Sequence, residues 1–503
     1  MLISLILFSG CFTSSITTEY NELHEAVKKN EKIRALTTDS TVFTFDKFSF
    51  TDSTLTGNGN QKKKGSSESF DTTLAFSNII FIERLKTNNW KIVWLIPAAI
   101  AVGSGISYLS QPTEFDIRRP VEGSCPYIYS FDGSNYALEG EAFSTSISKA
   151  FESESYHILS HPKSSDHRVN IQIRNERPET HLINKVSLYA VDLQKAKYAV
   201  LDTENKVWPV HHAIPPESAF EQSQDIRNLI AIKDGIYWKP ALSDIGPGSN
   251  FKDELQVQFE IPYVASDATL IIHAINTNLI SELFRMTGAL LGDEALQFYN
   301  ALDQDPKLKS IVKKGIDRSS LKIEVKDHGV WKSVGAILPE ATKIPFTRAI
   351  RLKNLTKGTL KIRLSSLKDV WHIDSISLDY SKVKELTKYP LELKKVNSTQ
   401  PASYLKEKIS SNDSLYEIIL PPNQLDISFD TTPADDMQSP EYLLGVRGYM
   451  LEWLPNRKDQ SIVKKISVYN ETDRIKLLKD LIQDEDLVLP MIYEKWRQTK
   501  MLE

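Results

Sequence analysis

The chain has 503 residues, enough for two to four domains that each bury a core of their own. Its content of 41% hydrophobic and 25% charged residues is that of an ordinary folded protein. The 61 Lys and Arg residues nearly balance the 65 Asp and Glu residues, for a net charge of -4. This balance excludes the basic excess expected of a protein that binds nucleic acid, so no nucleic-acid partner is predicted.

The first ten residues, MLISLILFSG, carry no charged side chain and lead directly to Cys11. An apolar run that ends in small residues is the pattern of a secretory signal peptide. The string LFSGC also resembles the lipobox of bacterial lipoproteins, in which an aliphatic residue and two small residues precede a cysteine. In that family the cysteine sulfur receives a diacylglyceryl group and the chain is cut just before it.

The resemblance implies a lipoprotein signal peptide at residues 1–10, lipidation of Cys11 with palmitate-like acyl chains, and a polar tether over residues 11–31. It also implies a place in the bacterial cell envelope, at the outer membrane or a periplasmic face rather than in the cytoplasm. A buried first strand that happens to contain a cysteine is the alternative.

Residues 32–85 have the pattern of strands and predict a small antiparallel β domain. In TVFTFDKFSF the phenylalanines alternate, with a slip at Asp46-Lys47. The stretch TLAFSNIIFIERL adds a further strand or pair of strands. Between them, TGNGNQKKKGSSES is rich in Gly, Asn, Lys and Ser and predicts a flexible polar loop.

A second apolar segment covers residues 90–110, with no charge between Lys91 and Glu114. The 18 residues from Ile92 to Leu109 reach the lower limit for a helix that spans a bilayer. Three interpretations stay open: a spanning or re-entrant helix, a helix on the membrane surface, and a hairpin or helix buried in protein. Residues 111–123 follow as a linker.

Residues 124–380 predict a β-sandwich or jelly-roll-like ectodomain. Asp132-Gly133 marks a hairpin turn between two aromatic strands. The strand HRVNIQIRNE is expected to pair with HLINKVSLYAVDL across RPET.

A helical insert over residues 277–315 interrupts the strands. In its last helix, Asp305 is the predicted N-cap, Pro306 the first helical residue and Gly315 the stop. Residues 381–503 predict a mixed α/β C-terminal region. The predicted fold class is therefore mainly β with α insertions.

The order of motifs along most of the chain is similar to that of a group of bacterial envelope lipoproteins to which no activity is assigned. In that group a small β domain and a hydrophobic segment precede three motifs. These stand here as CPYIYSFDG from Cys125 to Gly133, WHIDSISLD from Trp371 to Asp379, and GYMLEW from Gly448 to Trp453. The likeness implies an envelope lipoprotein and transfers no activity.

Histidines are the first candidates for a metal site. His157 and His161 have the four-residue spacing of two ligands on one helix face, and His167 follows in the same stretch. No acidic ligand is fixed nearby, so surface histidines are the preferred interpretation. The adjacent His211 and His212 would point to opposite faces of a strand.

Carboxylates and a thiol are the next candidates. Glu139 and Glu141 would share a strand face, where one pKa of a pair can rise for acid–base work, although a solvated face is preferred. Asp435-Asp436 suit either Ca²⁺ or a plain turn, and the turn is preferred. With Cys11 lipidated, Cys125 has no cysteine partner and is expected to be a packed thiol. No catalytic, metal or cofactor site is predicted.

Trp371 and Asp374 are the candidate ligand contacts, because their strand resembles the closing strand of carbohydrate-binding jelly rolls. Asp374 is expected to accept a hydrogen bond from the backbone or from Arg363. Exposed Trp or Tyr side chains can stack on sugar rings, but the core is the expected place for most of the tryptophans in β segments, which are Trp208, Trp238, Trp331, Trp371 and Trp453.

Together these features predict a lipid-anchored protein of the cell envelope with a binding or structural role, and a non-enzyme is preferred. Its expected partners are the membrane, through the lipid on Cys11 and through residues 92–109, and a glycan or an envelope protein. Two alternatives stay open: an envelope hydrolase that acts on glycan or peptide, and a membrane-embedded component of an envelope assembly.

Overall fold

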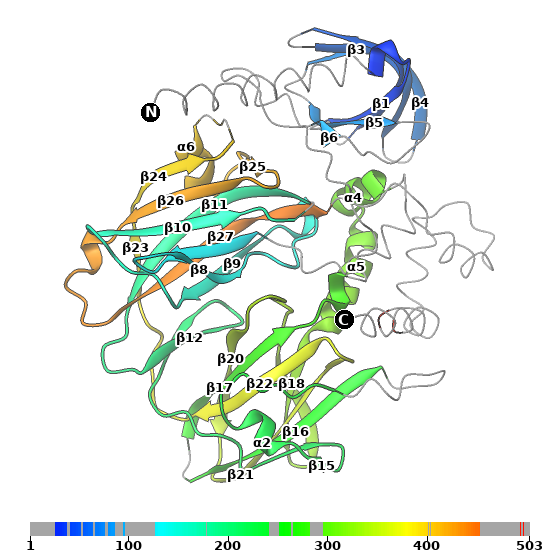
Figure 1. Cartoon of the computed structure of the whole chain (residues 1–503). Coiled ribbons are helices and arrows are strands. Elements are labelled where there is room, and N and C mark those ends of the chain that lie inside the picture. The colour runs from blue at the N-terminus through cyan, green and yellow to red at the C-terminus, as the bar shows by residue number, and fades with distance from the viewer. Residues whose placement is uncertain are drawn as a thin grey trace. The chain divides into compact units, whose positions relative to one another are not determined.

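The computed structural model describes residues 26–452, with gaps at 38–40, 52–53, 64–65, 76–78, 86–93, 96–125, 178, 241–250, 263–264, 282–294, 401 and 403, together with Tyr493 and Trp496. The described chain is mainly β, as the sequence predicts (Figure 1). It divides into two compact units. The first comprises Met1–Arg119, Ala295–Gln304 and Ser398–Leu405, and the second comprises Pro120–Glu294, Asp305–Asn397 and Lys406–Glu503.

One antiparallel sheet with the order β4-β3-β2-β1-β5-β6 forms the β domain of the first unit. Its strands are β1 (Lys32–Thr37), β2 (Val42–Phe50), β3 (Thr54–Lys63), β4 (Ser66–Ala75), β5 (Ile79–Leu85) and β6 (Trp94–Leu95). The register of β2 against β3 shifts between Phe45 and Lys47, which confirms the predicted slip in the alternation. Phe43 and Phe45 both pack edge-on against Phe70, and this aromatic cluster forms part of the small core. Helix α4 (Ala295–Gln304) also belongs to this unit.

The predicted polar loop between the phenylalanine strands is wrong, because β3 and β4 run through it. At positions 57 and 59 the backbone of β3 lies so close to β2 that only glycine fits. A Cβ on Gly57 would meet the Lys47 carbonyl oxygen at 2.3 Å, and a Cβ on Gly59 would meet that of Thr44 at 1.9 Å. The composition typical of a loop thus marks a close backbone approach and a strand with polar faces.

The second apolar segment begins as an edge strand. Trp94 and Leu95 form β6, which pairs with Glu83 and Ile82 of β5. A continuous helix from Ile92 is therefore excluded at its start, while residues 96–109 lie outside the described part of the chain. Of the helices within the described residues, none is long and apolar enough to cross a membrane.

The second unit contains two sandwiches. The first sandwich has one sheet of order β24-β26-β10-β7-β8 and one of order β23-β11-β27-β9, with β25 paired to β11. Its strands are β7 (Tyr127–Phe131), β8 (Tyr136–Glu141), β9 (Ser153–Leu159), β10 (Arg168–Arg174), β11 (Glu179–Asp192), β23 (Lys388–Leu391), β24 (Leu393–Ser398), β25 (Glu417–Ile419), β26 (Gln424–Asp430) and β27 (Pro440–Glu452). Helix α6 (Leu405–Ser410) and the short helices η3 (Lys149–Phe151) and η5 (Thr432–Ala434) connect them.

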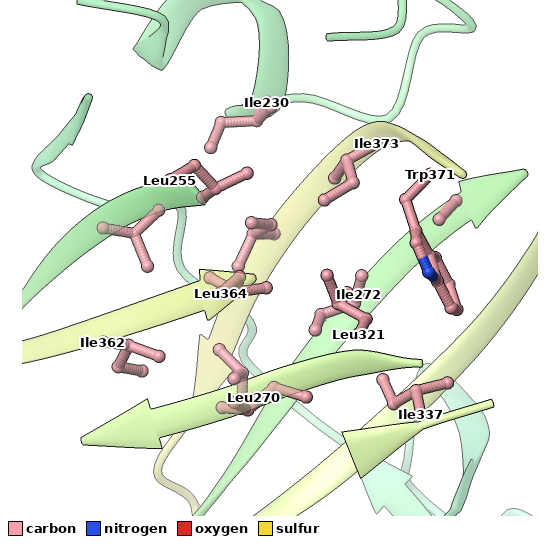
Figure 2. Packing of buried hydrophobic residues seen from close by; sticks show 14 of the residues in the cluster. Ile230, Leu255, Leu270, Ile272, Leu321, Ile337, Ile362, Leu364, Trp371 and Ile373 are labelled. Carbon is pink, nitrogen blue, oxygen red and sulfur yellow. The ribbon is translucent and has the colours of Figure 1, made fainter. Parts of the chain in front are cut away.

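The second sandwich has sheets of order β13-β12-β20-β17-β22 and β15-β14-β16-β21-β18-β19. Its strands are β12 (Tyr198–Asp202), β13 (Val207–Val210), β14 (Ser218–Glu221), β15 (Gln224–Asp225), β16 (Lys252–Ile261), β17 (Ala265–Asn276), β18 (Leu321–Asp327), β19 (Val330–Ile337), β20 (Phe346–Leu355), β21 (Gly358–Leu367) and β22 (Trp371–Asp379). Figure 2 shows apolar side chains of both sheets meeting in its core, among them Leu270 and Ile272 of β17 against Ile362 and Leu364 of β21. Helix α2 (Arg227–Ile230) contributes Ile230 to the same core.

Two expectations about the first sandwich are wrong. HRVNIQIRNE, which contains β10, does not pair with β11; β10 lies between β7 and β26, and β11 lies beside β27 in the other sheet. The domain boundary predicted at residue 380 is also wrong, because the sheets of the first sandwich continue beyond it. Strands β23 to β27 complete the sheets that begin at Tyr127, so the residues after 380 pair with strands about 250 positions earlier.

The cap of helix α5 (Pro306–Ser319) is confirmed and its end is corrected. The Asp305 side chain accepts hydrogen bonds from the backbone N–H groups of Lys307 and Leu308, and Pro306 opens the helix. The helix continues past Gly315 to Ser319, and Leu308 and Val312 are buried along it. Past the glycine, Ser319 is also buried and its carbonyl oxygen accepts from the Trp371 indole, so packing continues to the end of the helix and outweighs the modest cost of one glycine.

Candidate functional site

Trp371 and Asp374, the candidate ligand contacts, lie inside the second sandwich. The Trp371 side chain is in the core shown in Figure 2, and its indole N–H donates to the Ser319 carbonyl oxygen at 2.8 Å. Asp374 is 1% exposed. Neither side chain offers a surface to a ligand. Trp371 packs in the core with Ile373, whereas Asp374 is the residue skipped where the register of β22 against β17 shifts, and the loop at Asp234 and Gly235 bonds to it.

Asp374 and Asp379 hold neighbouring backbone. Asp374 Oδ1 accepts from the N–H groups of Asp234 and Gly235 at 3.2 and 3.1 Å. This confirms the expected backbone partner, and Arg363 bonds to Glu324 instead. Asp379 Oδ2 accepts from the N–H groups of His211 and His212 at 2.7 and 3.0 Å. The histidine pair therefore marks a backbone turn rather than a joint side-chain site.

Glu139 and Glu141 do not act as a carboxylate pair. Glu139 accepts from the N–H groups of Ser160 and His161 at 2.7 and 2.9 Å and from the Ser130 hydroxyl. Glu141, which is 1% exposed, accepts from the N–H groups of Thr342 and Lys343 at 2.8 and 2.7 Å. The preferred solvated face is thus also wrong, since both carboxylates fix loops.

The three clustered histidines have separate surroundings. The buried His157 ring lies 3.1 Å from the Ser155 hydroxyl, and burial, aided by the charge of Arg348, lowers its pKa to about 3. His161 and His167 are half or more exposed; they lie beside Glu139 and Asp435 respectively. Asp435 itself belongs to the turn at η5, as preferred from the sequence. Within the described residues no group of three His, Cys, Asp or Glu side chains is placed to hold a metal ion.

A histidine–glutamate pair that the sequence does not single out lies on β11. His181 Nε2 is 2.7 Å from Glu179 Oε1, and the side chains are 0% and 1% exposed. Such a dyad resembles an acid–base pair, but complete burial keeps both groups from a substrate. We assign it a structural role.

A buried polar junction connects the two sandwiches of the second unit. Glu141 on β8 binds the loop before β20 through the two N–H groups named above. From the other side, the Arg348 guanidinium of β20 donates to the Tyr156 carbonyl oxygen at 2.8 Å and to Glu340 at 2.6 Å. Burial raises the pKa of Glu340, while Arg348 acts in the opposite direction. These contacts stabilise one arrangement of the two sandwiches and commit Glu141, Glu340 and Arg348 to structure.

The outward face of the sheet β24-β26-β10-β7-β8 carries a different set of side chains. On β10, Ile171 and Ile173 are buried, so the intervening Gln172 and the following Arg174 point away from the core. The pairing register places Tyr129 and Asp426 on either side of Gln172. We call this surface the aromatic–arginine face; its members are Tyr129, Phe131, Tyr136, Gln172, Arg174 and Asp426.

Arg174 is held in one orientation at the centre of the aromatic–arginine face. Its guanidinium lies 4.0 Å from the centroid of the Tyr129 ring and 6.0 Å from that of Tyr136, a cation–π arrangement. Its Nε donates to Gln172 Oε1 at 2.9 Å, and the Gln172 amide donates to Asp426 Oδ1 at 2.7 Å. The Arg174 side chain is still 29% exposed.

The edge of this face is formed by the hydrogen-bonded pair Tyr129 and Glu176 and by the rings of Phe131 and Tyr136. The Tyr129 hydroxyl donates to Glu176 at 2.8 Å, and burial, followed by that bond, raises the pKa of Tyr129 to about 12. The rings of Phe131 and Tyr136 lie 5.4 Å apart and tilted. Arg174 Nε and Nη2 both donate to Gln172, whereas Nη1 is 3.9 Å from Glu176, beyond hydrogen-bond distance, so the Nη1 N–H groups can donate to an incoming acceptor.

The face combines aromatic rings with an oriented guanidinium, an amide and a carboxylate. Rings offer apolar contact to the C–H groups of a flat ligand, while the fixed polar groups donate to and accept from hydroxyls. Because the polar groups are already bonded to one another, little side-chain freedom is lost when a ligand binds. Glu176 lies near the Arg174 guanidinium and Asp426 bonds to the neighbouring Gln172, so the face suits a neutral polar ligand better than a strongly charged one.

Sequence reasoning found only half of this face. The predicted pair of aromatic strands about the turn at Asp132 is confirmed, with Tyr129 and Phe131 on β7 and Tyr136 on β8. Asp132 accepts from the N–H groups of Ser134 and Asn135. The polar half comes from β10 and β26, and Asp426 lies 254 positions from Gln172. The alternation of polar residues in RVNIQIRN was the available signal.

Several predicted residues lie outside the described part of the chain. These are the lipidation site Cys11, the thiol Cys125, Trp453 and the signal-peptide, tether and linker residues 1–25 and 111–123. Of the other tryptophans, Trp238 is buried, whereas Trp208 and Trp331 are half-buried beneath the guanidinium groups of Arg351 and Arg363 at 4.2 and 4.7 Å.

No protein-family model matches the chain, and no curated protein matches its sequence. Solved structures with some similarity include an allantoicase, which is 10% identical with a TM-score of 0.19 over 52% of this chain and 93% of that chain. A β-porphyranase of glycoside hydrolase family 86 from Bacteroides plebeius is 9% identical with a TM-score of 0.17, over 61% of this chain and 44% of its own.

A third similar structure is a GH31 α-xylosidase from Xanthomonas citri, 10% identical with a TM-score of 0.16 over 80% of this chain and 38% of its own. This chain thus spans less than half the length of either glycosidase. At such identities and TM-scores the neighbours carry no argument about function.

Proposed function

We propose that the chain is a lipid-anchored binding protein of the bacterial cell envelope that holds a saccharide on its aromatic–arginine face. The observation that carries this proposal is the fixed position of Arg174, stacked on Tyr129 and bonded to Gln172, with part of its side chain open to solvent. The anchor is proposed from the lipobox-like string before Cys11.

Binding is proposed in preference to hydrolysis because of what the predicted carboxylates do. A glycoside hydrolase needs two carboxyl groups that flank an accessible bond. Glu139, Glu141, Asp374 and Asp379 each accept hydrogen bonds from backbone N–H groups of neighbouring loops, which commits them to structure. An envelope hydrolase and a membrane-embedded component of an envelope assembly remain the alternatives.

Replacement of Arg174 tests the binding face. We expect Arg174→Ala to weaken binding of the full chain to solubilised envelope glycan by about tenfold, because a charge-assisted hydrogen-bond donor and the stack on Tyr129 are both lost. Arg363→Ala is the matched control, since Arg363 stacks on Trp331 and bonds to Glu324 in the same way on the second sandwich. Binding is measured by titration calorimetry.

Equal affinities of the Arg174→Ala and Arg363→Ala proteins would remove the face from the proposal. Release of reducing ends by the wild-type chain, lost in a carboxylate variant that still folds, would favour the hydrolase instead.

Replacement of Cys11 tests the anchor. In cells given a fatty-acid probe, the wild-type chain should be labelled and cleaved, whereas Cys11→Ser should be unlabelled and remain as the longer precursor, because only the thiol accepts the diacylglyceryl group. Cys125→Ser, which leaves the lipobox-like string intact, should be labelled like wild type. Equal labelling of the Cys11→Ser and wild-type chains would contradict lipidation at this residue.

A further inference from the structure

The loop that follows α2 exposes two isoleucines. Ile232 is 67% and Ile236 is 59% exposed, whereas Ile230 and Trp238 at the two ends of the loop are buried in the core of the second sandwich. We call residues 231–237 the tip loop. An exposed aliphatic side chain loses the favourable free energy of burial. Two of them on one short loop therefore indicate a surface that is covered by a partner.

Hydrogen bonds fix the backbone of the tip loop in its middle and at its C-terminal end. Asp374 accepts from the N–H groups of Asp234 and Gly235, and Ile236 N–H donates to Asp234 Oδ1 at 2.9 Å. Trp238 exchanges backbone hydrogen bonds with Ile373 of β22, at 2.7 and 3.1 Å. The exposure of the isoleucines is therefore imposed by a fixed backbone, and the role of the buried Asp374 carboxylate is to set that backbone.

Charges beside the isoleucines are mostly positive. Lys233 and Lys239 are exposed and outnumber the carboxylate of Asp234, which accepts from the Ile236 N–H and keeps its charge. Apolar side chains flanked by ammonium groups suit the interface of a bilayer, where acyl chains lie next to lipid phosphates. The match is to an anionic bilayer, because each nearby lysine adds attraction to a negative surface.

We propose that the tip loop inserts Ile232 and Ile236 into the surface of an anionic lipid bilayer, with Lys233 and Lys239 at the lipid phosphates. This rests on the proposed envelope location, where a bilayer carries the anchor at Cys11. A single lipid anchor does not fix the orientation of a domain. A second, weak contact is strengthened by the high effective concentration of the tethered surface, and it fixes which side of the second sandwich faces the membrane.

Partition into vesicles tests the tip loop without the lipid anchor. The full chain carrying Cys11→Ser is sedimented with vesicles of phosphatidylglycerol and phosphatidylethanolamine. On this background, Ile232→Asp with Ile236→Asp should lower the partition coefficient by about tenfold, because apolar contact is replaced by repulsion. Val330→Asp is the matched control, since Val330 is 62% exposed on the edge strand β19, and it should leave the coefficient unchanged.

Contributions from separate contacts add, so binding through residues 92–109 would not hide the loss. Equal coefficients for the loop variant and its parent, or no binding of the parent, overturn the proposal. A dimer that forms without vesicles and is lost in the loop variant would assign the tip loop to self-association and also overturn it. Because the test protein has no lipid and no glycan, its outcome is independent of the two tests of the proposed function.

Discussion

Asp253 is a buried carboxylate that no motif or spacing singles out. It is 5% exposed; Oδ2 accepts from the Asp369 N–H at 2.6 Å, and Oδ1 is 3.7 Å from the Lys368 ammonium. Burial raises its pKa from 3.8 to about 7, and the hydrogen bond and Lys368 only partly offset this. Nearby, Trp496 donates to Asp369 and Tyr493 to the Lys368 carbonyl oxygen, so C-terminal residues help to exclude water.

The raised pKa predicts a pH dependence of stability. Between pH 4 and 7 the folded state binds a proton at Asp253 that the unfolded chain has lost. The contribution of this residue to the free energy of unfolding therefore falls as the pH rises, by up to about 1.4 kcal/mol per pH unit. Asp253→Asn does not titrate, so its stability relative to wild type should improve across this range.

Urea unfolding of both proteins at pH 4.5, 6 and 7.5 measures this difference. Asp267→Asn is the control, because its carboxylate lies at a half-exposed position. A difference between wild type and Asp253→Asn that stays constant with pH would mean that the carboxylate is ionised throughout.

Secondary structure shows where sequence patterns suffice and where they fail. Local signals were reliable: the turn at Asp132 and the cap at Asp305 each depend on contacts within a few residues, and the slip at Asp46 is visible in the alternation of its own strand. Gly57 and Gly59 led to the wrong prediction of a loop, because glycine is favoured both in loops and where two strands pack closely. Only the position of the neighbouring strand distinguishes the two cases. The continuation of α5 past Gly315 was hidden because glycine commonly ends a helix, and the tertiary packing that keeps this helix intact does not show in the local pattern.

The cap of α5 gives a prediction at this scale. Asp305→Ala should destabilise the helix by about 1 kcal/mol, because two backbone N–H groups lose their acceptor. Asp305→Asn keeps a side-chain oxygen and should retain most of the stability. Hydrogen exchange of the amides of Lys309 to Val312 reports the change, and equally fast exchange in both variants would contradict the assigned cap.

At the scale of the molecule, the fold class was predictable but the strand pairing was not. Alternating apolar residues identify strands and a mainly β chain, which is confirmed. They carry no information about which strands pair across 250 residues. The pairing of β26 with β10 and of β27 with β11, which completes the first sandwich, was therefore not predictable. The same limit explains the candidate site: the aromatic strands were visible in the sequence, whereas their polar partners arrive through long-range pairing.

The central claim, that a saccharide binds on the aromatic–arginine face, can be tested by photo-crosslinking. Envelope glycan fragments that carry a diazirine are bound to the full chain, irradiated, and the labelled peptides are mapped by mass spectrometry. We predict labels on the peptides that contain β7, β8, β10 and β26, and their loss with Arg174→Ala but not with Arg363→Ala. Labels confined to the second sandwich, or labelling that Arg174→Ala leaves unchanged, would contradict the claim.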